Sequence, residues 1–189
     1  MKTALPVTPF HIIPATTIYF LFFRRLNGLA FFLGTFLIDL EPFLYLFFNI
    51  HIPQVPLLFG GYARQGPHMI THNQFSVVFL VTPAILHLTK LTESNAREFL
   101  LKIFSGSEWI KYSWKQTYLS ALFGAFLHLG WDLTMHYDIN LGFPFLDIPN
   151  PFISFQAFSI ILLASFVMIL PAYFIGKRLN TGSPFKKLP

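Results

Sequence analysis

The last long apolar stretch of the chain runs from Gln156 to Gly176 and reads QAFSIILLASFVMILPAYFIG. It carries no charged side chain, and its length is close to the roughly 20 residues that a helix needs to cross a hydrocarbon core about 30 Å thick. Four earlier stretches have a similar character: about Pro6–Phe23, Gly28–Ile50, Met69–Thr89 and Thr117–Tyr137. The five stretches predict an all-α, polytopic membrane helix bundle.

The composition supports a lipid environment. The chain has 189 residues, of which 54% are hydrophobic and 11% charged, and 25 are Phe. A typical soluble domain is about 25% charged. A soluble chain of this size keeps much of its surface in water, and so apolar a chain has too little polar surface to cover it. We expect a single transmembrane helical domain over residues 1–180 and a flexible cytoplasmic tail over residues 181–189.

The basic residues predict the orientation. When the five stretches cross the membrane alternately, 11 of the 13 Lys and Arg residues fall on one side, and only Lys2 and Arg64 fall on the other. Because cytoplasmic loops collect Lys and Arg, this places the N-terminus outside and the C-terminus inside. We therefore expect a multi-pass protein of a prokaryotic cytoplasmic (inner) membrane, with lipid as its partner. Basic residues this scattered argue against nucleic acid.

Ionisable residues inside the apolar stretches are the candidates for chemistry. A charged residue at mid-span costs roughly 2.5–3.5 kcal/mol on insertion scales, so it needs a reason to be there. The chain has no Cys, which excludes thiolate metal sites and leaves His, Asp and Glu as strong ligands. The predicted topology brings eight such residues into the outer layer of the membrane. They are His11, Asp39, Glu41, His68, His72, His128, Asp132 and His136.

Helical spacing relates several of these residues. His128, Asp132 and His136 follow one another at four-residue intervals and share one helix face. They span about 12 Å along the helix axis, which is too long for one metal with ligand bonds of about 2 Å. Two adjacent metals with Asp132 between them fit better. His68 and His72 have the spacing by which one helix offers two imidazoles to a single ion.

The two carboxylates of the second stretch, Asp39 and Glu41, are only two residues apart and would diverge on a regular helix. Pro42 disfavours regular helix at Glu41, and a break there would allow both side chains to face the site. We predict Glu41 as the general base or else a further ligand, and Asp39 as a catalytic residue and metal ligand. An ion pair with Arg64 is the alternative for both carboxylates.

The ordered motifs resemble a known family. Thr-Pro-Phe-His11, Asp39-x-Glu41-Pro42, His68-x3-His72, His128-x3-Asp132-x3-His136 and Asn150-Pro-Phe together resemble the predicted membrane-bound metal-dependent hydrolases. The order is distantly similar to that of zinc-dependent phospholipase C and P1 nuclease. The resemblance covers about four-fifths of the chain and implies a hydrolase with a divalent metal, most often zinc, without implying a substrate.

Our leading hypothesis is metal-assisted hydrolysis of a phosphoester, such as a phospholipid headgroup, at the outer membrane face. One Zn²⁺ would be held by Asp39, His72, His128 and Asp132, and a second by His136, His68 and His11. Three alternatives stand beside it: a metal or proton transporter, in which the same residues mark an ion path; a non-catalytic protein with a structural metal; and a metal-free polar network that holds helices together.

Overall fold

The computed structural model describes residues 8–22, 25–50, 53–63, 66, 68–103 and 112–180. Within these ranges the protein is helical, as predicted, and its extended segments form only isolated bridges. The predicted tail, residues 181–189, lies outside them, as does Arg64. The elements are α1 (Thr8–Phe22), α2 (Gly28–Leu37), α3 (Leu40–Phe48), α4 (Gln74–Ser76), the π-helix η1 (Val77–Val81), α5 (Thr82–Ile103), α6 (Trp114–Asp132) and α7 (Phe155–Asn180).

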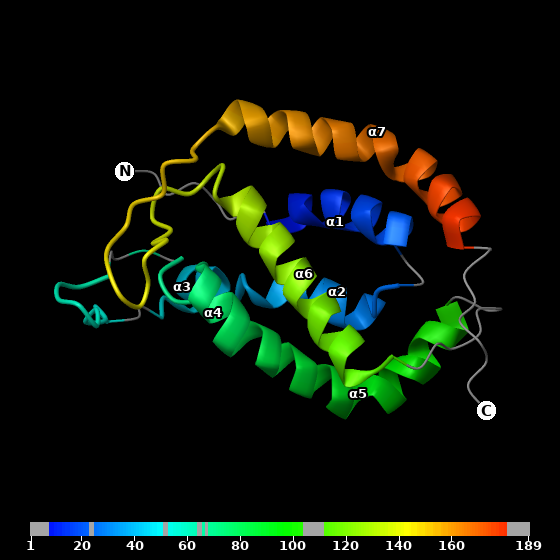
Figure 1. Cartoon of the computed structure of the whole chain (residues 1–189), viewed down its shortest axis with the longest axis horizontal. Helices are drawn as coiled ribbons and strands as arrows, with labels where there is room; N and C mark the ends of the chain where they lie inside the picture. Colours follow the sequence, from blue (N-terminus) through cyan, green and yellow to red (C-terminus); the bar gives the residue numbers. More distant parts are fainter. Residues whose placement is uncertain are drawn as a thin grey trace.

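The bundle is built around α6. In Figure 1, α6 crosses α2 in the middle of the molecule, α1 lies between this pair and α7, and α5 lies along the opposite side. Glycines allow the α2–α6 crossing to be close. A Cβ on Gly34 would collide with the backbone carbonyl of Ala121, and one on Gly124 would collide with that of Phe31. This close approach positions the ends of α2 and α6, which carry the candidate ligands.

The second predicted stretch is broken, as anticipated, but at Asp39 rather than at Glu41. The helices α2 and α3 meet there at an angle of 47°. Pro42 lies in the first turn of α3, where a missing N–H is tolerated. In a continuous helix the N–H of residue 42 would bond to the carbonyl of Ile38. Because Pro42 has no N–H, that carbonyl is left for another donor.

By length and composition, the described residues give fewer candidate membrane spans than the five predicted. Among the described residues, Gln74–Thr92 and Phe155–Leu179 are long and apolar enough to cross a membrane, and the bent pair α2–α3 would make a third. The first stretch yields only a short apolar helix, Phe10–Phe22. The fourth forms α6, which begins with polar residues and contains His128 and Asp132, and it is not among the candidates.

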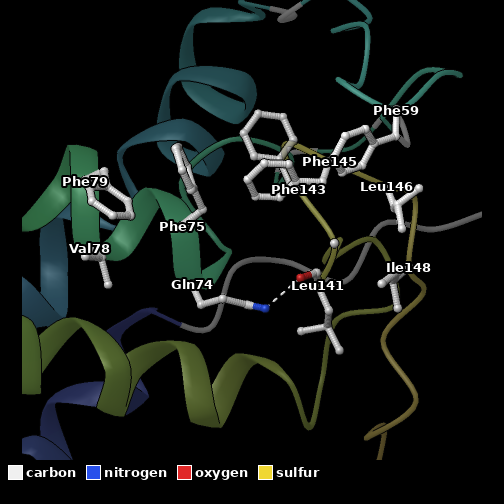
Figure 2. Close-up of a pocket in the computed structure, with 11 residues that line it drawn as sticks. Phe59, Gln74, Phe75, Val78, Phe79, Leu141, Phe143, Phe145, Leu146 and Ile148 are labelled. Carbon is white, nitrogen blue, oxygen red and sulfur yellow. Dashed lines mark hydrogen bonds between the residues drawn. The ribbon is translucent and has the colours of Figure 1, made fainter.

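Two loops pack together at one end of the bundle. The amides of Leu58 and Phe59 donate to the carbonyls of Pro144 and Phe145. The rings of Phe59 and Phe145 stack with centroids 5.7 Å apart (Figure 2). Asn150 donates from its side-chain amide to the carbonyl of His136, which ties the loop before α7 to the turn after α6. The loops thus lie beside His136, one of the predicted metal ligands.

Candidate metal centre

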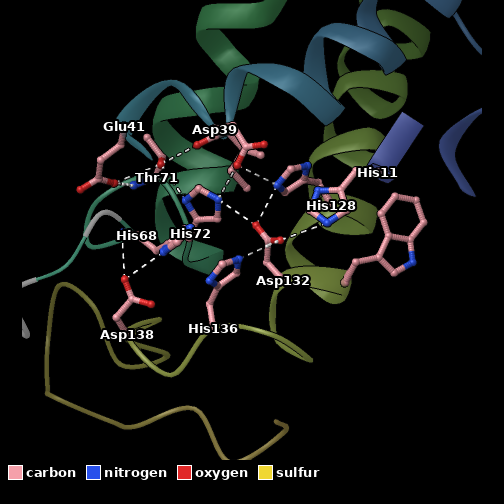
Figure 3. Close-up of polar contacts among 12 residues, drawn as sticks. His11, Asp39, Glu41, His68, Thr71, His72, His128, Asp132, His136 and Asp138 are labelled. Atoms are coloured by element: carbon pink, nitrogen blue, oxygen red, sulfur yellow. Dashed lines mark hydrogen bonds and ion pairs between the residues drawn. The ribbon is translucent and has the colours of Figure 1, made fainter. Parts of the chain in front are cut away.

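All seven predicted metal ligands come together in the interior. Their side chains come from α1, the α2–α3 break, the loop before α4, α6 and the turn after α6 (Figure 3). None is more than 6% exposed. They are His11, Asp39, His68, His72, His128, Asp132 and His136. The clustering comes from tertiary packing, because residues separated by up to 125 positions contribute to it.

The first ligand group combines two carboxylates and two imidazoles. Asp39, His72, His128 and Asp132 offer ligand atoms that all lie within 4.8 Å of one another. Oδ2 of Asp132 is 2.8 Å from Nε2 of His128 and 2.9 Å from Nε2 of His72. Oδ1 of Asp39 is 3.1 Å from both nitrogens. The four residues could hold a metal ion.

A second group shares Asp132 with the first. His68, Asp132 and His136 also offer ligand atoms within 4.8 Å of one another. The imidazoles of His68 and His136 lie close together, with ring centroids 3.9 Å apart and ring planes tilted by 33°. Asp132 is thus common to two adjacent groups, which is the geometry expected of a carboxylate between two ions.

His11 belongs to neither group but lies against the shared carboxylate. Its Nε2 is 3.3 Å from Oδ1 of Asp132. Its ring packs edge-on against His128, with centroids 4.4 Å apart, and Trp131 lies beyond it. Its place in the second ligand set therefore remains a prediction.

The prediction that His68 and His72 lie on one helix is wrong. Both lie in the turns and bends before α4, and each belongs to a different ligand group. Asn73 follows them as the N-cap of α4: its side chain accepts from the amide of Ser76 and donates to the carbonyl of Ile70. Asn73 therefore fixes the end of the ligand-bearing loop against the start of the helix.

Several buried polar atoms of the cluster have no hydrogen-bond partner. Since unpaired buried polar groups are costly, such atoms indicate a missing partner. The atoms are Oδ2 of Asp39, Nδ1 of His128 and Nδ1 of His11; Nε2 of His11 and Oδ1 of Asp132 also make no hydrogen bond, but they lie 3.3 Å from each other. Carboxylate oxygens and imidazole nitrogens are also the atoms that a divalent transition metal binds.

Thr71 fixes the tautomer of His72. Its hydroxyl oxygen lies 2.6 Å from the carbonyl oxygen of Ile38, the one left free by Pro42, and 3.1 Å from Oε2 of Glu41. Both partners are acceptors, so the single hydroxyl hydrogen of Thr71 must point to one or be shared between them. The hydroxyl can then only accept from Nδ1 of His72, 3.0 Å away, and that nitrogen must carry a hydrogen.

A hydrogen on Nδ1 determines what Nε2 of His72 can do. In the neutral ring this atom carries a lone pair, and it faces oxygens of both Asp39 and Asp132 at 3.1 and 2.9 Å. Three electron-rich atoms this close need a shared positive charge, which is either a proton on Nε2 or a bound metal ion. The hydrogen-bond chain from Ile38 through Thr71 thus presents His72 as a ligand.

Glu41 faces away from both ligand groups. Its Oε1 accepts from the amide of Met69 at 3.1 Å, and its Oε2 accepts from the amides of Ile70 and Thr71 at 2.8 Å. These bonds use the carboxylate to shape the loop between His68 and His72. We therefore assign Glu41 a positioning role in place of the predicted role as general base or ligand.

Sequence reasoning missed Asp138. Its Oδ2 accepts from Nδ1 of His68 at 2.9 Å, which leaves the other ring nitrogen of His68 for a ligand role. Burial is the largest influence and acts to raise the pKa of Asp138, but the hydrogen bond and charge of His68, a backbone hydrogen bond and the charge of His136 together outweigh it, so the pKa lies below the ordinary carboxyl value. Gly66 leaves room for this contact, since a Cβ there would meet the Asp138 side chain. The position of Asp138 two residues after His136 was the available signal.

Comparisons of the chain with models of known protein families, with curated proteins and with solved structures find no match. The resemblance to membrane-bound metal-dependent hydrolases therefore remains a prediction from the motifs.

Proposed function

We propose that this protein is a membrane-embedded, metal-dependent hydrolase of phosphoesters. The observation that carries the proposal is the shared carboxylate. Asp132, 1% exposed, belongs to two adjacent groups of buried imidazoles and carboxylates. Paired metals held close together are a common arrangement in phosphatases and nucleases. The motif resemblance points to the same class of reaction.

Zinc suits the donor set best, because it prefers imidazole nitrogen and carboxylate oxygen in four-coordinate sites. The first group offers four protein ligands, as a structural site does. The second, His68, Asp132 and His136, offers three and leaves a position for water or substrate. Metal ions bound here would lower the pKa of water toward neutrality and stabilise negative charge on phosphoryl oxygens.

The protein's own groups then orient the reactants. Glu41 is engaged by the loop amides, and both oxygens of Asp132 face imidazole nitrogens, whereas Oδ2 of Asp39 has no partner. That oxygen is our candidate to accept a proton from an attacking water. Asp138 and Thr71 hold the rings of His68 and His72 in the orientation that directs their other nitrogens inward.

The core next to the cluster favours a hydrolase over a transporter. Further along α2 and α6, the packed residues are Ala30, Val81, Ile85 and Ala121, which offer no ionisable group. A path for protons or metal ions would need ionisable groups to continue through this layer, where the neighbouring buried side chains Thr35, Thr82 and Ser120 offer only hydroxyls. A one-sided site agrees with catalysis at one membrane face.

Turnover tests the proposal. Zinc-loaded protein in detergent should hydrolyse bis(4-nitrophenyl) phosphate. His136→Ala should lose both this activity and one metal, because it removes a ligand from the open group alone. His87→Ala is the matched control, since His87 is an exposed histidine of α5 outside the cluster. Activity in His136→Ala equal to that of His87→Ala would overturn the catalytic role. Bound metal without any turnover would favour a structural site.

A further inference from the structure

An apolar pocket lies beside the candidate metal centre. Its volume is about 570 Å³, within the range of small-molecule sites, roughly 300–1,000 Å³. Phe75, Val78 and Phe79 line it from α4 and η1, and Phe145 and Ile148 line it from the loop after α6 (Figure 2). No lining residue is charged. The side-chain amide of Gln74, also in the lining, donates to the carbonyl of Leu141 at 2.7 Å.

The pocket lies next to the segment that carries two of the candidate ligands. Gln74 follows the ligand His72 by two residues at the start of α4. The lining residue Phe143 belongs to the same buried hydrophobic cluster as Met69, the neighbour of His68. A molecule bound in the pocket therefore lies next to the loop that supplies one ligand to each metal group.

The pocket is also continuous with the surface that the bilayer covers. Its helical wall is the first part of the candidate span Gln74–Thr92. Phe79, in that wall, is 62% exposed, and the next residue, Leu80, is 51% exposed. On a membrane-spanning helix such side chains contact lipid. A hydrocarbon chain can thus enter the pocket sideways from the bilayer without crossing water.

We propose that this pocket binds a hydrocarbon chain of a membrane phospholipid, and that the substrate of the metal centre is that lipid's phosphoester. The substrate assignment rests on the proposed hydrolase function, whereas binding of the chain does not. An uncharged lining whose amide is already bonded accepts an apolar chain and offers nothing to a charged headgroup. The exposed rings of Phe59 and Phe145 become covered when the chain is bound.

Photo-cross-linking tests the binding of the chain. The probe is phosphatidylglycerol with a diazirine in one acyl chain, diluted into nanodiscs of dioleoylphosphatidylglycerol that contain the intact protein. Cross-links should concentrate on peptides that line the pocket. Phe59→Ser/Phe145→Ser should reduce them about tenfold, since two aromatic contacts are lost. The matched control, Phe47→Ser/Phe152→Ser, alters two exposed aromatics outside the pocket and should leave them unchanged.

Cross-links spread evenly over the lipid-facing helices, or equal loss of cross-links in both double variants, would overturn the proposal that the pocket binds an acyl chain.

Turnover then separates the two proposals. Phe59→Ser/Phe145→Ser should lower hydrolysis of phosphatidylglycerol in mixed micelles and leave hydrolysis of bis(4-nitrophenyl) phosphate unchanged. Equal hydrolysis of the lipid by this variant and the control would overturn the substrate assignment. Pocket cross-links without hydrolysis of either compound would contradict the hydrolase function while supporting the chain-binding pocket.

Discussion

Single hydrogen bonds determine how the candidate ligands present their atoms. Pro42 leaves the carbonyl of Ile38 free, Thr71 donates to that carbonyl, and His72 donates to Thr71. The chain of bonds ends at Nε2 of His72, which faces Asp39 and Asp132. On the other side, Asp138 orients His68 in the same manner. Residues that touch no metal are therefore expected to control metal affinity.

The role of Thr71 is open to a direct test. Thr71→Val keeps the shape of the side chain but removes the hydroxyl, so it should weaken zinc binding by the first group about 10–100-fold. Thr71→Ser retains the hydroxyl and should bind zinc within a few-fold of the wild type. Competition with a calibrated chelator measures both. If the Val variant binds as tightly as the Ser variant, the hydroxyl does not fix the His72 tautomer.

Asp138 should affect only the second group. Asp138→Asn removes the charge that orients His68 and should weaken the second metal about 10–100-fold while the first stays bound. Asp147→Asn is the control, because Asp147 is an exposed acidic residue of the same loop. Titration calorimetry with zinc distinguishes the two metals. Loss of both metals, or equal behaviour of the two variants, would contradict the assignment.

The sequence was sufficient to select the seven buried residues that the structure brings together, because each is an ionisable residue in or beside an apolar stretch and burial of such residues is costly. It was insufficient for Glu41, Thr71 and Asp138. Their roles depend on which backbone amide or imidazole lies opposite, as in the contact of Glu41 with the amides of residues 69–71. Such contacts join segments far apart in the chain, and residue spacing carries no information about them.

Among the elements, the crossing of α2 and α6 matters most for the site. Gly34 and Gly124 bring the two backbones together, and the ends of these helices supply Asp39, His128 and Asp132. A larger residue at the crossing would push the helices apart and so separate Asp39 from the other ligands. The two glycines thus help to position the candidate ligands although neither is itself a ligand.

Two glycines of α6 provide a matched pair. Gly124→Ala places a methyl group against the carbonyl of Phe31 and should destabilise the protein by about 1–3 kcal/mol. A methyl group added at Gly130 would meet nothing within 4 Å, so Gly130→Ala should be neutral or stabilising by about 0.5–1 kcal/mol. Thermal unfolding in detergent, followed by circular dichroism, compares them. Equal melting temperatures would contradict the close crossing.

Element boundaries were only partly predictable. Pro42 signalled the break in the second stretch, but the break falls at Asp39 because proline is accepted in the first turn of α3. The spacing of His68 and His72 suggested a helix, whereas Glu41 and Asn73 hold that segment in turns through their side chains. Side-chain bonds from elsewhere in the molecule outweighed the local periodicity there.

For the whole molecule, α7 gives the clearest evidence of a lipid environment. Its span Phe155–Leu179 has only 11% of its most apolar window buried. The all-α class followed from the apolar stretches, but the span count did not. A helix that is buried between neighbouring helices also has an apolar sequence of this length. Both α1 and α6 are packed between neighbours in that way.

Because the chain has no Cys, single cysteines can report the orientation of α7. Phe152 lies just before the start of the span and Lys177 lies near its end, and both positions are exposed. A cysteine at each position, Phe152→Cys or Lys177→Cys, therefore reports on one end of the span. The distribution of basic residues predicts that an impermeant maleimide labels Phe152→Cys in intact cells and Lys177→Cys only after the membrane is opened. The reverse pattern would invert the predicted topology, and labelling of both in intact cells would contradict a span.

The most direct measurement is the metal content of the purified protein, wild type beside Asp132→Ala and His87→Ala. Asp132 belongs to both ligand groups, so its loss should act on both ions at once. We expect about two equivalents of zinc in the wild type and in His87→Ala, and less than about one in Asp132→Ala. No metal in the wild type after reconstitution with zinc, or an unchanged content in Asp132→Ala, would contradict a metal centre and leave a buried polar network in its place.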